Sequence, residues 1–245
     1  MIRFDNVVKK FEGRAVLDGV SFEVTKGEIL VIVGPSGTGK SVTLKHLVRL
    51  LTPTSGSVWL DDIEISSATG KKLEAVRERF GYLFQGGALL GWLTVAENVA
   101  LPLRERTRLP EAEIEMRVVK ALDAVELLPA ADRYPAEISG GMQKRAGLAR
   151  AIVRQSDIIL YDEPTSGLDP VTSNALDDLI LRLRETRGVT FVVVTHELPS
   201  IFKIADRCAM FDRARHGMVA LGKPAELRDS SADPFVRSFF NRGRS

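Results

Sequence analysis

Residues 34–41 read Gly-Pro-Ser-Gly-Thr-Gly-Lys-Ser, which fits the phosphate-binding pattern G-x-x-x-x-G-K-[S/T]. The stretch before this loop, Ile29–Val33, is short, apolar and mostly β-branched, as a buried parallel strand should be. Residues 42–51 after the loop carry apolar side chains at helical spacing. A strand, a glycine-rich loop and a helix in this order bring backbone N–H groups and a helix N-terminus to one point. The stretch therefore predicts binding of a nucleoside triphosphate, since a mere glycine-rich turn does not require this pattern.

Two side chains carry most of the chemistry expected of the loop. The Lys40 ammonium would bind the β and γ phosphates, and the Ser41 hydroxyl would ligate Mg²⁺. Nucleotide contacts are expected from the whole loop and the residue after it: Gly34, Pro35, Ser36, Gly37, Thr38, Gly39, Lys40, Ser41 and Val42.

The size and composition of the chain limit what else it can be. Its 245 residues suffice for one large domain, or for one domain with a subdomain. A net charge of +2 is too small to predict a nucleic-acid partner. One cysteine, Cys208, excludes an internal disulfide. Because no apolar run reaches the ~18–20 residues that span a bilayer, and the N-terminus lacks a secretion signal, we expect a cytoplasmic location.

A second apolar stretch ends in two acidic residues. Residues 158–161 predict a buried strand, and Asp162 at its end could hold the Mg²⁺ that accompanies a triphosphate. The adjacent Glu163 could polarise a water for attack on the γ phosphate. Chance is a poor explanation for this pair once the phosphate loop is present.

Three other side chains stand near expected strand ends. Phe11 lies in a polar loop between strands expected over residues 2–8 and 15–24, where it could stack on a base or pack back onto the sheet. Gln85 follows a strand expected at residues 80–84 and could ligate Mg²⁺ or be an ordinary surface glutamine. His196 follows the apolar residues 191–194, where a histidine can hydrogen-bond a γ phosphate.

Helix-capping signals are clear in the second half of the chain. Ser139, followed by Gly140 and Gly141, is a natural N-cap for a helix over residues 142–154, and a cap is the usual explanation of such a triplet. Asp169 and Gly188 are expected to cap the two ends of another helix.

The middle of the chain predicts a helical subdomain. Residues 86–103 are unusually apolar for a loop, and residues 109–128 predict one amphipathic helix. This apolar content suits a subdomain core, although an exposed remnant could dock a partner.

With these motifs in one order, the chain resembles the ATP-binding subunits of ABC transporters over nearly its whole length. Residues 34–41 match the Walker A motif, Asp162 ends the Walker B motif, and Glu163 matches the catalytic glutamate. Residues 166–169 match the D-loop.

The resemblance also assigns the three side chains near strand ends: Phe11 matches the adenine-stacking aromatic, Gln85 the Q-loop and His196 the switch histidine. It thus implies catalysis by Glu163, His196 and Lys40. Mg²⁺ would be held by Ser41, Gln85 and Asp162.

The resemblance implies an α/β fold: a P-loop NTPase (RecA-like) core sheet with an N-terminal antiparallel β subdomain and an inserted α-helical subdomain. We expect residues 1–84 and 156–228 to form the nucleotide-binding core, residues 85–155 the helical subdomain, and residues 229–245 a C-terminal extension. Residues 233–240 of this extension predict a short helix, and the extension could dock a partner or fray, which is the default for a chain terminus.

The signature motif departs from the family form L-S-G-G-Q, since Ile138 and Met142 stand at its ends. Ser139, Gly140 and Gly141 remain, and in the family they close over the ATP of a second cassette. Together with the S-G-G-M variant at residues 139–142, the stretches 85–89 and 93–103 resemble the ATPases of Mla-type (lipid-asymmetry) phospholipid transporters and of their relatives for sterols and organic solvents.

This resemblance implies a homodimer with ATP and Mg²⁺, held by multi-pass permease subunits at the cytoplasmic face of the inner membrane, with lipid-binding and small accessory subunits and no nucleic acid. The cargo could also be a different one. The alternative is a non-transport, single-cassette ABC ATPase that serves as a cytosolic assembly scaffold. A kinase would need an acceptor site, and a GTPase would need an N-K-x-D motif, which the sequence lacks.

Overall fold

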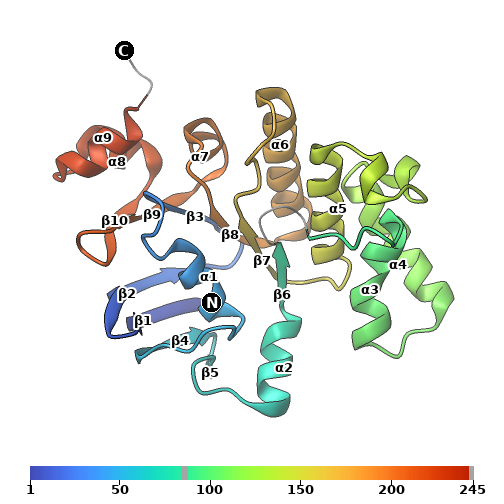
Figure 1. Ribbon diagram of the computed structural model, residues 1–245, viewed down its shortest axis with the longest axis horizontal. Coiled ribbons are helices and arrows are strands. Elements are labelled where there is room, and N and C mark those ends of the chain that lie inside the picture. Colours follow the sequence, from blue (N-terminus) through green and yellow to red (C-terminus); the bar gives the residue numbers. More distant parts are fainter. Residues whose placement is uncertain (84–87, 243–245) are drawn as a thin grey trace. The chain divides into compact units, whose positions relative to one another are not determined.

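The computed structural model describes residues 1–83 and 88–242 (Figure 1). The chain divides into two compact units. The first unit comprises Met1–Arg77 and Thr190–Ser245, and the second comprises Glu78–Val189. Each unit is built of strands and helices, as the α/β prediction requires.

An antiparallel sheet forms one part of the first unit. Its strand order is β2-β1-β4-β5, with bounds Arg14–Val24, Ile2–Phe11, Ser55–Leu60 and Ile63–Glu64. The stacked rings of Phe4 and Phe22 (centroids 4.5 Å apart) pack between β1 and β2. The first strand was expected to end at residue 8, but β1 continues to Phe11, because residues 9–11 pair with residues 14–17 of β2. Phe11 therefore ends a strand and does not lie in a loop.

The other strands of the first unit have the order β10-β9-β3-β8, with bounds Gly217–Gly222, Arg207–Asp212, Ile29–Val33 and Thr190–Val194. β3 runs parallel to both of its neighbours, β9 and β8. Every residue of β3 and of β8 is buried, which is typical of parallel strands covered on both faces. The buried parallel strand predicted before the phosphate loop is confirmed.

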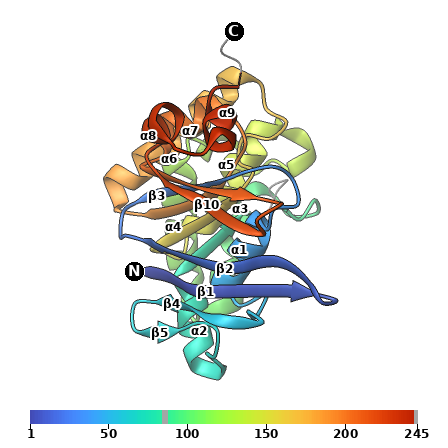
Figure 2. The ribbon, with the colours of Figure 1, turned by 90° about the vertical axis from the view of Figure 1, so that its left-hand side faces the viewer.

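Five helices belong wholly or mainly to the first unit: α1 (Lys40–Leu47), α2 (Gly70–Glu78), α7 (Leu198–Ile204), α8 (Pro224–Ser230) and α9 (Pro234–Phe240). Of these, α7, α8 and α9 gather together (Figure 2), and the ring of Phe202 from α7 meets the ring of Phe240 from α9 edge to face, 6.2 Å apart. Val236, Phe239 and Phe240 are buried. The short helix predicted over residues 233–240 is therefore confirmed as α9, and its buried apolar face means that the default of a frayed terminus does not hold there.

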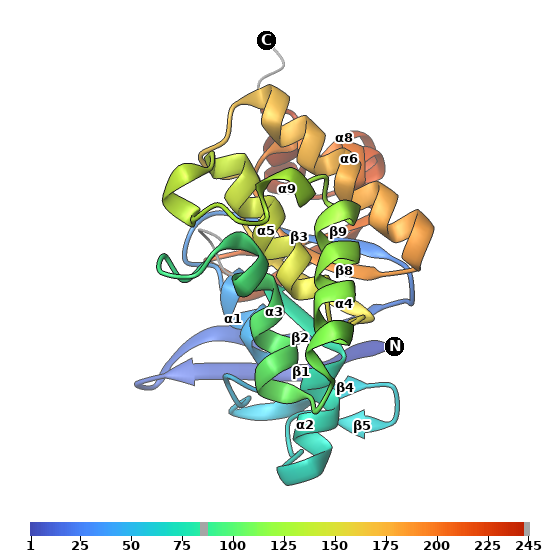
Figure 3. The same cartoon turned by 90° about the vertical axis from the view of Figure 1, so that its right-hand side faces the viewer.

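In its described residues, the second unit contains the parallel strands β6 (Phe80–Leu83) and β7 (Ile158–Asp162), whose register pairs Leu83 with Tyr161. Its helices are α3 (Val95–Arg106), α4 (Glu111–Ala124), α5 (Gly140–Ile152) and α6 (Pro170–Arg187), with short 3-10 turns at Leu128–Ala130 and Pro135–Glu137. α3, α4 and α5 pack against one another (Figure 3).

One helix prediction in the second unit is refined and another is corrected. The sequence predicts a helical subdomain here without bounds for α3; a capping box of Thr94 and Glu97 starts this helix, which runs through Pro102. The helix expected over residues 109–128 is shorter, since Pro110 is its N-cap and Glu126 has a positive φ of 57°.

A partly buried ion pair in the first unit joins Glu28 and Arg207, which are far apart in sequence. Glu28 is 6% exposed and accepts hydrogen bonds from Arg207 Nε (2.6 Å) and from the N–H and hydroxyl of Thr25 (2.7 and 2.9 Å). Burial acts to raise the pKa of Glu28, but these hydrogen bonds outweigh it and lower the pKa below its ordinary value.

Replacing Glu28 by Gln is expected to lower the free energy of unfolding at pH 7 by about 2 kcal/mol, because Arg207 loses its buried partner. A lowered pKa in the folded state means that the stabilisation is present at neutral pH and is lost as the pH falls through that pKa, so the difference between variant and wild type should shrink in acid. Urea unfolding at several pH values measures this difference in the free energy of unfolding. Asp157→Asn, which breaks the exposed pair with Arg79, is the control and should cost less than about 0.5 kcal/mol.

Candidate active site

The phosphate loop leaves the carboxyl end of β3 and turns into α1 at Gly39. This glycine is the N-cap of α1 and has a φ of 95°, in the left-handed region. A Cβ atom on it would lie 2.6 Å from a methyl group of Leu17 in β2. Only glycine fits here, and the close contact places the loop against the antiparallel sheet.

Lys40 closes the loop on itself. Its Nζ donates to the carbonyl oxygens of Gly34 and Pro35, both at 2.8 Å, and the Thr38 hydroxyl donates to Pro35 O at 3.0 Å. Among the residues that the structure describes, no side chain caps the N-terminus of α1. An ammonium group and the first-turn N–H groups of a helix thus converge at the loop, which is the chemistry that a phosphate group requires.

The remaining loop residues differ in exposure. Gly34, Thr38 and Gly39 are buried, whereas Ser36 and Gly37 are exposed. Pro35, Ser41 and Val42 are half-buried, and Ser41 is the second residue of α1. The fold therefore brings the loop residues expected to contact a nucleotide into one compact turn.

His196 lies at the same strand edge of the first unit as the loop. β3 and β8 are adjacent, Ile32 pairs with Val194, and the Thr195 N–H donates to Ile32 O at 3.4 Å. The His196 side chain is 56% exposed, and its Nε2 lies 3.3 Å from Glu197 Oε1. It borders an open depression of about 710 Å³ lined by α7, α8, α9 and their flanking residues. Its ring is thus accessible to a ligand.

Phe11 is 42% exposed at the end of β1, so its ring is not buried in the sheet. The Lys9 ammonium lies 5.0 Å from the ring centroid and also donates to Thr52 O at 2.8 Å. The cation covers one face of the ring. The sequence analysis did not predict a role for Lys9, because its carbonyl partner lies 43 residues further along the chain.

In the second unit, β7 presents the two acidic residues. The strand is buried up to Tyr161, and Asp162 and Glu163 are half-buried where it ends. Burial and the charge of Asp162 raise the pKa of Tyr82 on the neighbouring β6, because a phenolate there would be desolvated beside a carboxylate. Glu163 has a φ of 52°, a left-handed conformation that is uncommon for a residue with a side chain.

The signature residues begin α5, as the capping pattern predicted. Ser139 is the N-cap, and its Oγ accepts from the Met142 N–H at 3.3 Å; Ser139 and Gly140 are exposed. A Cβ on Gly141 would lie 2.4 Å from the Thr172 Cγ2 of α6, so a larger residue would push the two helices apart. α5 can approach α6 this closely only with glycine at position 141.

The residue after Met142 has a local structural role. Gln143 Nε2 donates to Pro135 O at 2.8 Å and to Ile138 O at 3.5 Å, which ties the signature helix to the turn before it.

Asp169 caps α6 by accepting from the N–H groups of Val171 and Thr172, both at 3.0 Å. Gly188 ends α6 with a φ of 65°. Both predicted caps of this helix are confirmed.

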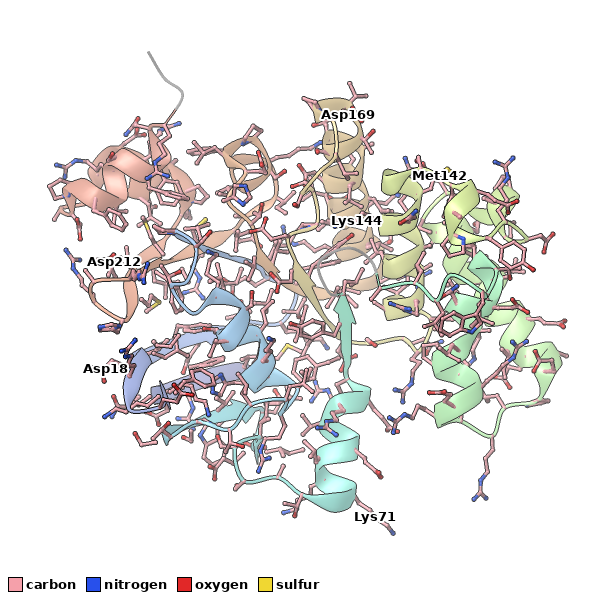
Figure 4. All side chains as sticks on the ribbon, in the orientation of Figure 1. Asp18, Lys71, Met142, Lys144, Asp169 and Asp212 are labelled. Carbon is pink, nitrogen blue, oxygen red and sulfur yellow. The ribbon has the colours of Figure 1, made fainter. Side chains whose placement is uncertain are left out.

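Lys144 was not predicted as a site residue. It lies on α5 (Figure 4) with 7% of its surface exposed, and its Nζ is 3.3 Å from the carbonyl oxygen of Glu163. Burial lowers the pKa of Lys144, while the Glu163 and Asp162 carboxylates act to raise it; burial has the larger effect. Nothing in its sequence neighbourhood signals this contact.

The residues present suit a Mg²⁺ ion that a nucleotide carries in. Magnesium keeps several waters and takes one or two protein ligands beside phosphate oxygens. Within residues 1–83 and 88–242, no three His, Cys, Asp or Glu side chains are grouped to hold a metal on their own. The Ser41 hydroxyl and the Asp162 carboxylate are hard oxygen donors of the required kind. Gln85, the third predicted ligand, lies outside the described residues.

Among the described residues, no helix is both long enough and apolar enough to cross a bilayer.

Comparison with known proteins agrees with this fold and these motifs. Residues 17–166 match the family described as ABC transporter. The probable ribonucleotide transport ATP-binding protein mkl of Mycobacterium leprae is 42% identical over 99% of this chain and 69% of its own length. The intermembrane phospholipid transport system ATP-binding protein MlaF of Escherichia coli K12 is 41% identical over 93% of this chain and 84% of its own.

Among solved structures, a dimer of the ATP-binding cassette MJ0796 bound to ADP and phosphate is 33% identical. Its TM-score is 0.81, over 91% of this chain and 98% of the other. The predicted α/β fold of an ABC ATPase cassette is thus confirmed. The chain belongs to the ABC transporter family, as one of its ATP-hydrolysing subunits.

Proposed function

We propose that this subunit powers a transporter that moves phospholipid or a related hydrophobic cargo. The nucleotide part of the proposal rests on one observation, the Lys40 ammonium held across the phosphate loop beside the uncapped N-terminus of α1. The cargo part rests on the similarity to MlaF and on the signature residue Met142. A similar identity to mkl makes a ribonucleotide the competing cargo.

In this proposal, each site residue has a separate task toward ATP. Lys40 and the N–H groups at the start of α1 bind phosphate oxygens, and the exposed ring of Phe11 stacks on the adenine. The Ser41 hydroxyl and the Asp162 carboxylate would hold Mg²⁺, with Gln85 as a further ligand. When bound, the ion neutralises charge on the phosphates.

Glu163 and His196 take part in the chemical step. The Glu163 carboxylate accepts the proton of the attacking water as the water oxygen bonds to the γ phosphorus. The His196 imidazole donates a hydrogen bond to a γ-phosphate oxygen. In-line attack then transfers the bond from the leaving oxygen of ADP to the water oxygen, and the products are ADP and inorganic phosphate.

We further propose that two copies of the chain close over two ATP molecules. Ser139 and Gly140 are exposed at the N-terminus of α5, where a helix dipole favours an anion. Each copy would present this helix end to the γ phosphate held by the other. Closure on ATP and opening after hydrolysis would drive multi-pass permease subunits at the cytoplasmic face of the inner membrane. Lipid-binding and small accessory subunits would complete the complex.

Replacing Ser139 by Arg is expected to lower kcat at least 10-fold while ATP binding remains, because a large side chain would block the exposed helix end. Ser139→Asp separates this effect from helix stability: aspartate caps as well as serine, but its charge repels a phosphate. Phosphate release and binding of a fluorescent ATP analogue measure the two properties. Normal turnover in both variants would exclude a role of the signature in the partner's site.

The cargo is tested with the complete complex. The chain would be tagged and extracted gently from membranes, and its partners identified. The complex would then be reconstituted in vesicles, where phospholipid should stimulate ATP hydrolysis and ribonucleotides should not. Stimulation by ribonucleotides alone would overturn the lipid proposal. Recovery of the chain only with cytosolic proteins would instead support the assembly scaffold.

A further inference from the structure

A buried lysine contacts the backbone of the proposed catalytic base. Lys144 is 7% exposed on α5, and its Nζ lies 3.3 Å from the Glu163 carbonyl oxygen in the same unit. Burying an ammonium group is costly unless it is paired, so a lysine in this place needs a compensating contact. The Glu163 carbonyl supplies an acceptor, and the carboxylates of Asp162 and Glu163 supply opposite charge.

The backbone that receives this hydrogen bond is in an unusual conformation. Glu163 has a φ of 52°, which costs roughly 1–2 kcal/mol for a residue with a Cβ. Such a conformation persists only where the surroundings hold it. The direction of the Glu163 side chain depends on this backbone, because the Cα–Cβ bond turns with φ and ψ. A hydrogen-bond donor that holds the Glu163 carbonyl therefore also fixes the direction in which the Glu163 side chain leaves the backbone.

A second contact holds Lys144 itself in place. The Tyr161 hydroxyl, fully buried in β7, donates to the Lys144 carbonyl oxygen at 3.4 Å. α5 is also held against α6 at Gly141, where a Cβ would meet Thr172. The helix that begins with Ser139 is thus joined to the end of β7 through Lys144, and a shift of this helix would move the Glu163 backbone.

We propose that Lys144 is a positioning residue for Glu163: its ammonium holds the Glu163 carbonyl and so orients the carboxylate that accepts the proton of the attacking water. This inference rests on the proposed role of Glu163 as general base. Lys144 itself contacts neither ATP nor water in this scheme. Lys144 also links α5, the helix that the signature residues begin, to Glu163 of the same chain.

Replacing Lys144 by Met keeps the length and apolar stem of the side chain and removes the donor. In the full-length chain we expect kcat for ATP hydrolysis to fall about 10- to 100-fold, with KM changed less than about two-fold, because a hydrogen bond from a charged group is lost. Lys144→Arg, which can still donate, should recover most of kcat. Lys120→Met, an exposed lysine of the same unit, is the matched control and should leave kcat unchanged.

The decisive measurement is made in the Glu163→Gln background. If Lys144 acts through Glu163, adding Lys144→Met to Glu163→Gln should lower the residual turnover no further. A merely structural role would lower it by the same factor as in the wild type, and that result would overturn the inference. Normal kcat in Lys144→Met would overturn it as well. Thermal unfolding shows whether each variant folds. If Lys144→Met does not fold, Lys144→Gln replaces it, because its polar side chain is too short to reach the Glu163 carbonyl. Lys144→Gln must then lose kcat to the same extent.

Failure of the proposed function gives a different result. If Glu163→Gln hydrolyses ATP at the wild-type rate, Glu163 is not the base, and both proposals fall. If Glu163→Gln is inactive and Lys144→Met is fully active, only the positioning role of Lys144 falls.

Discussion

Glu163→Gln is expected to lower kcat for ATP hydrolysis by about 100-fold or more, while ATP still binds. A general base contributes about 10²- to 10⁴-fold to rate, and glutamine keeps the shape of glutamate without its basic oxygen. The carboxylate follows β7 directly, and the backbone at φ 52° suits glutamine as well as glutamate. Phosphate release under saturating ATP measures the loss, and a fluorescent nucleotide reports binding.

The control for this experiment is Glu185→Gln, which neutralises an exposed carboxylate on α6 of the same unit. It should leave both turnover and binding unchanged. If Glu163→Gln hydrolyses ATP normally, another group must accept the proton. A variant that loses turnover and binding together would instead mean that the substitution has disturbed the fold near β7.

The second large effect is expected for Lys40→Met, which should weaken ATP binding by about 100-fold. The ammonium donates charge-assisted hydrogen bonds, and each one lost to a phosphate oxygen costs about 1.5–3 kcal/mol. The loop also loses its own bonds from Nζ to Gly34 O and Pro35 O, both 2.8 Å. Titration calorimetry with ATP and with ADP measures the change, which should be larger for ATP because the γ phosphate is a main partner of Lys40.

Lys45→Met on the same helix serves as the matched control. Lys45 lies in the last turn of α1, away from the phosphate loop, so its loss should change affinity less than about two-fold. Equal affinity of wild type and Lys40→Met for ATP would refute the phosphate-binding role of the loop. Thermal unfolding without nucleotide separates loss of binding from loss of the loop conformation.

Short-range patterns in the sequence were sufficient for much of this protein. The phosphate loop, the strand that ends in Asp162 and Glu163, and the caps Ser139, Asp169 and Gly188 all follow from residues close together in the chain. Each depends on a period of two or 3.6 residues, or on hydrogen bonds within one helical turn. Such features need no knowledge of the path that the chain takes.

Local rules were wrong where other parts of the fold outweighed them. Pro102 lies inside α3, where a proline removes one helical hydrogen bond, and the capping box and the packing against α4 and α5 outweigh this loss. Phe11 was placed in a loop because its neighbours are polar, whereas pairing with Arg14 in β2 keeps it in a strand.

Only the tertiary structure decided the contacts between residues distant in sequence. Lys9 reaches a carbonyl 43 residues away, Lys144 reaches one 19 residues away, and Glu28 pairs with Arg207 across 179 residues. No periodicity encodes these partners, because each pair forms only when separate elements pack together. The phosphate loop and the strand that ends in the acidic pair were therefore predictable from the sequence alone, whereas the contacts of Lys9 with Phe11 and of Lys144 with the Glu163 carbonyl arise only from packing.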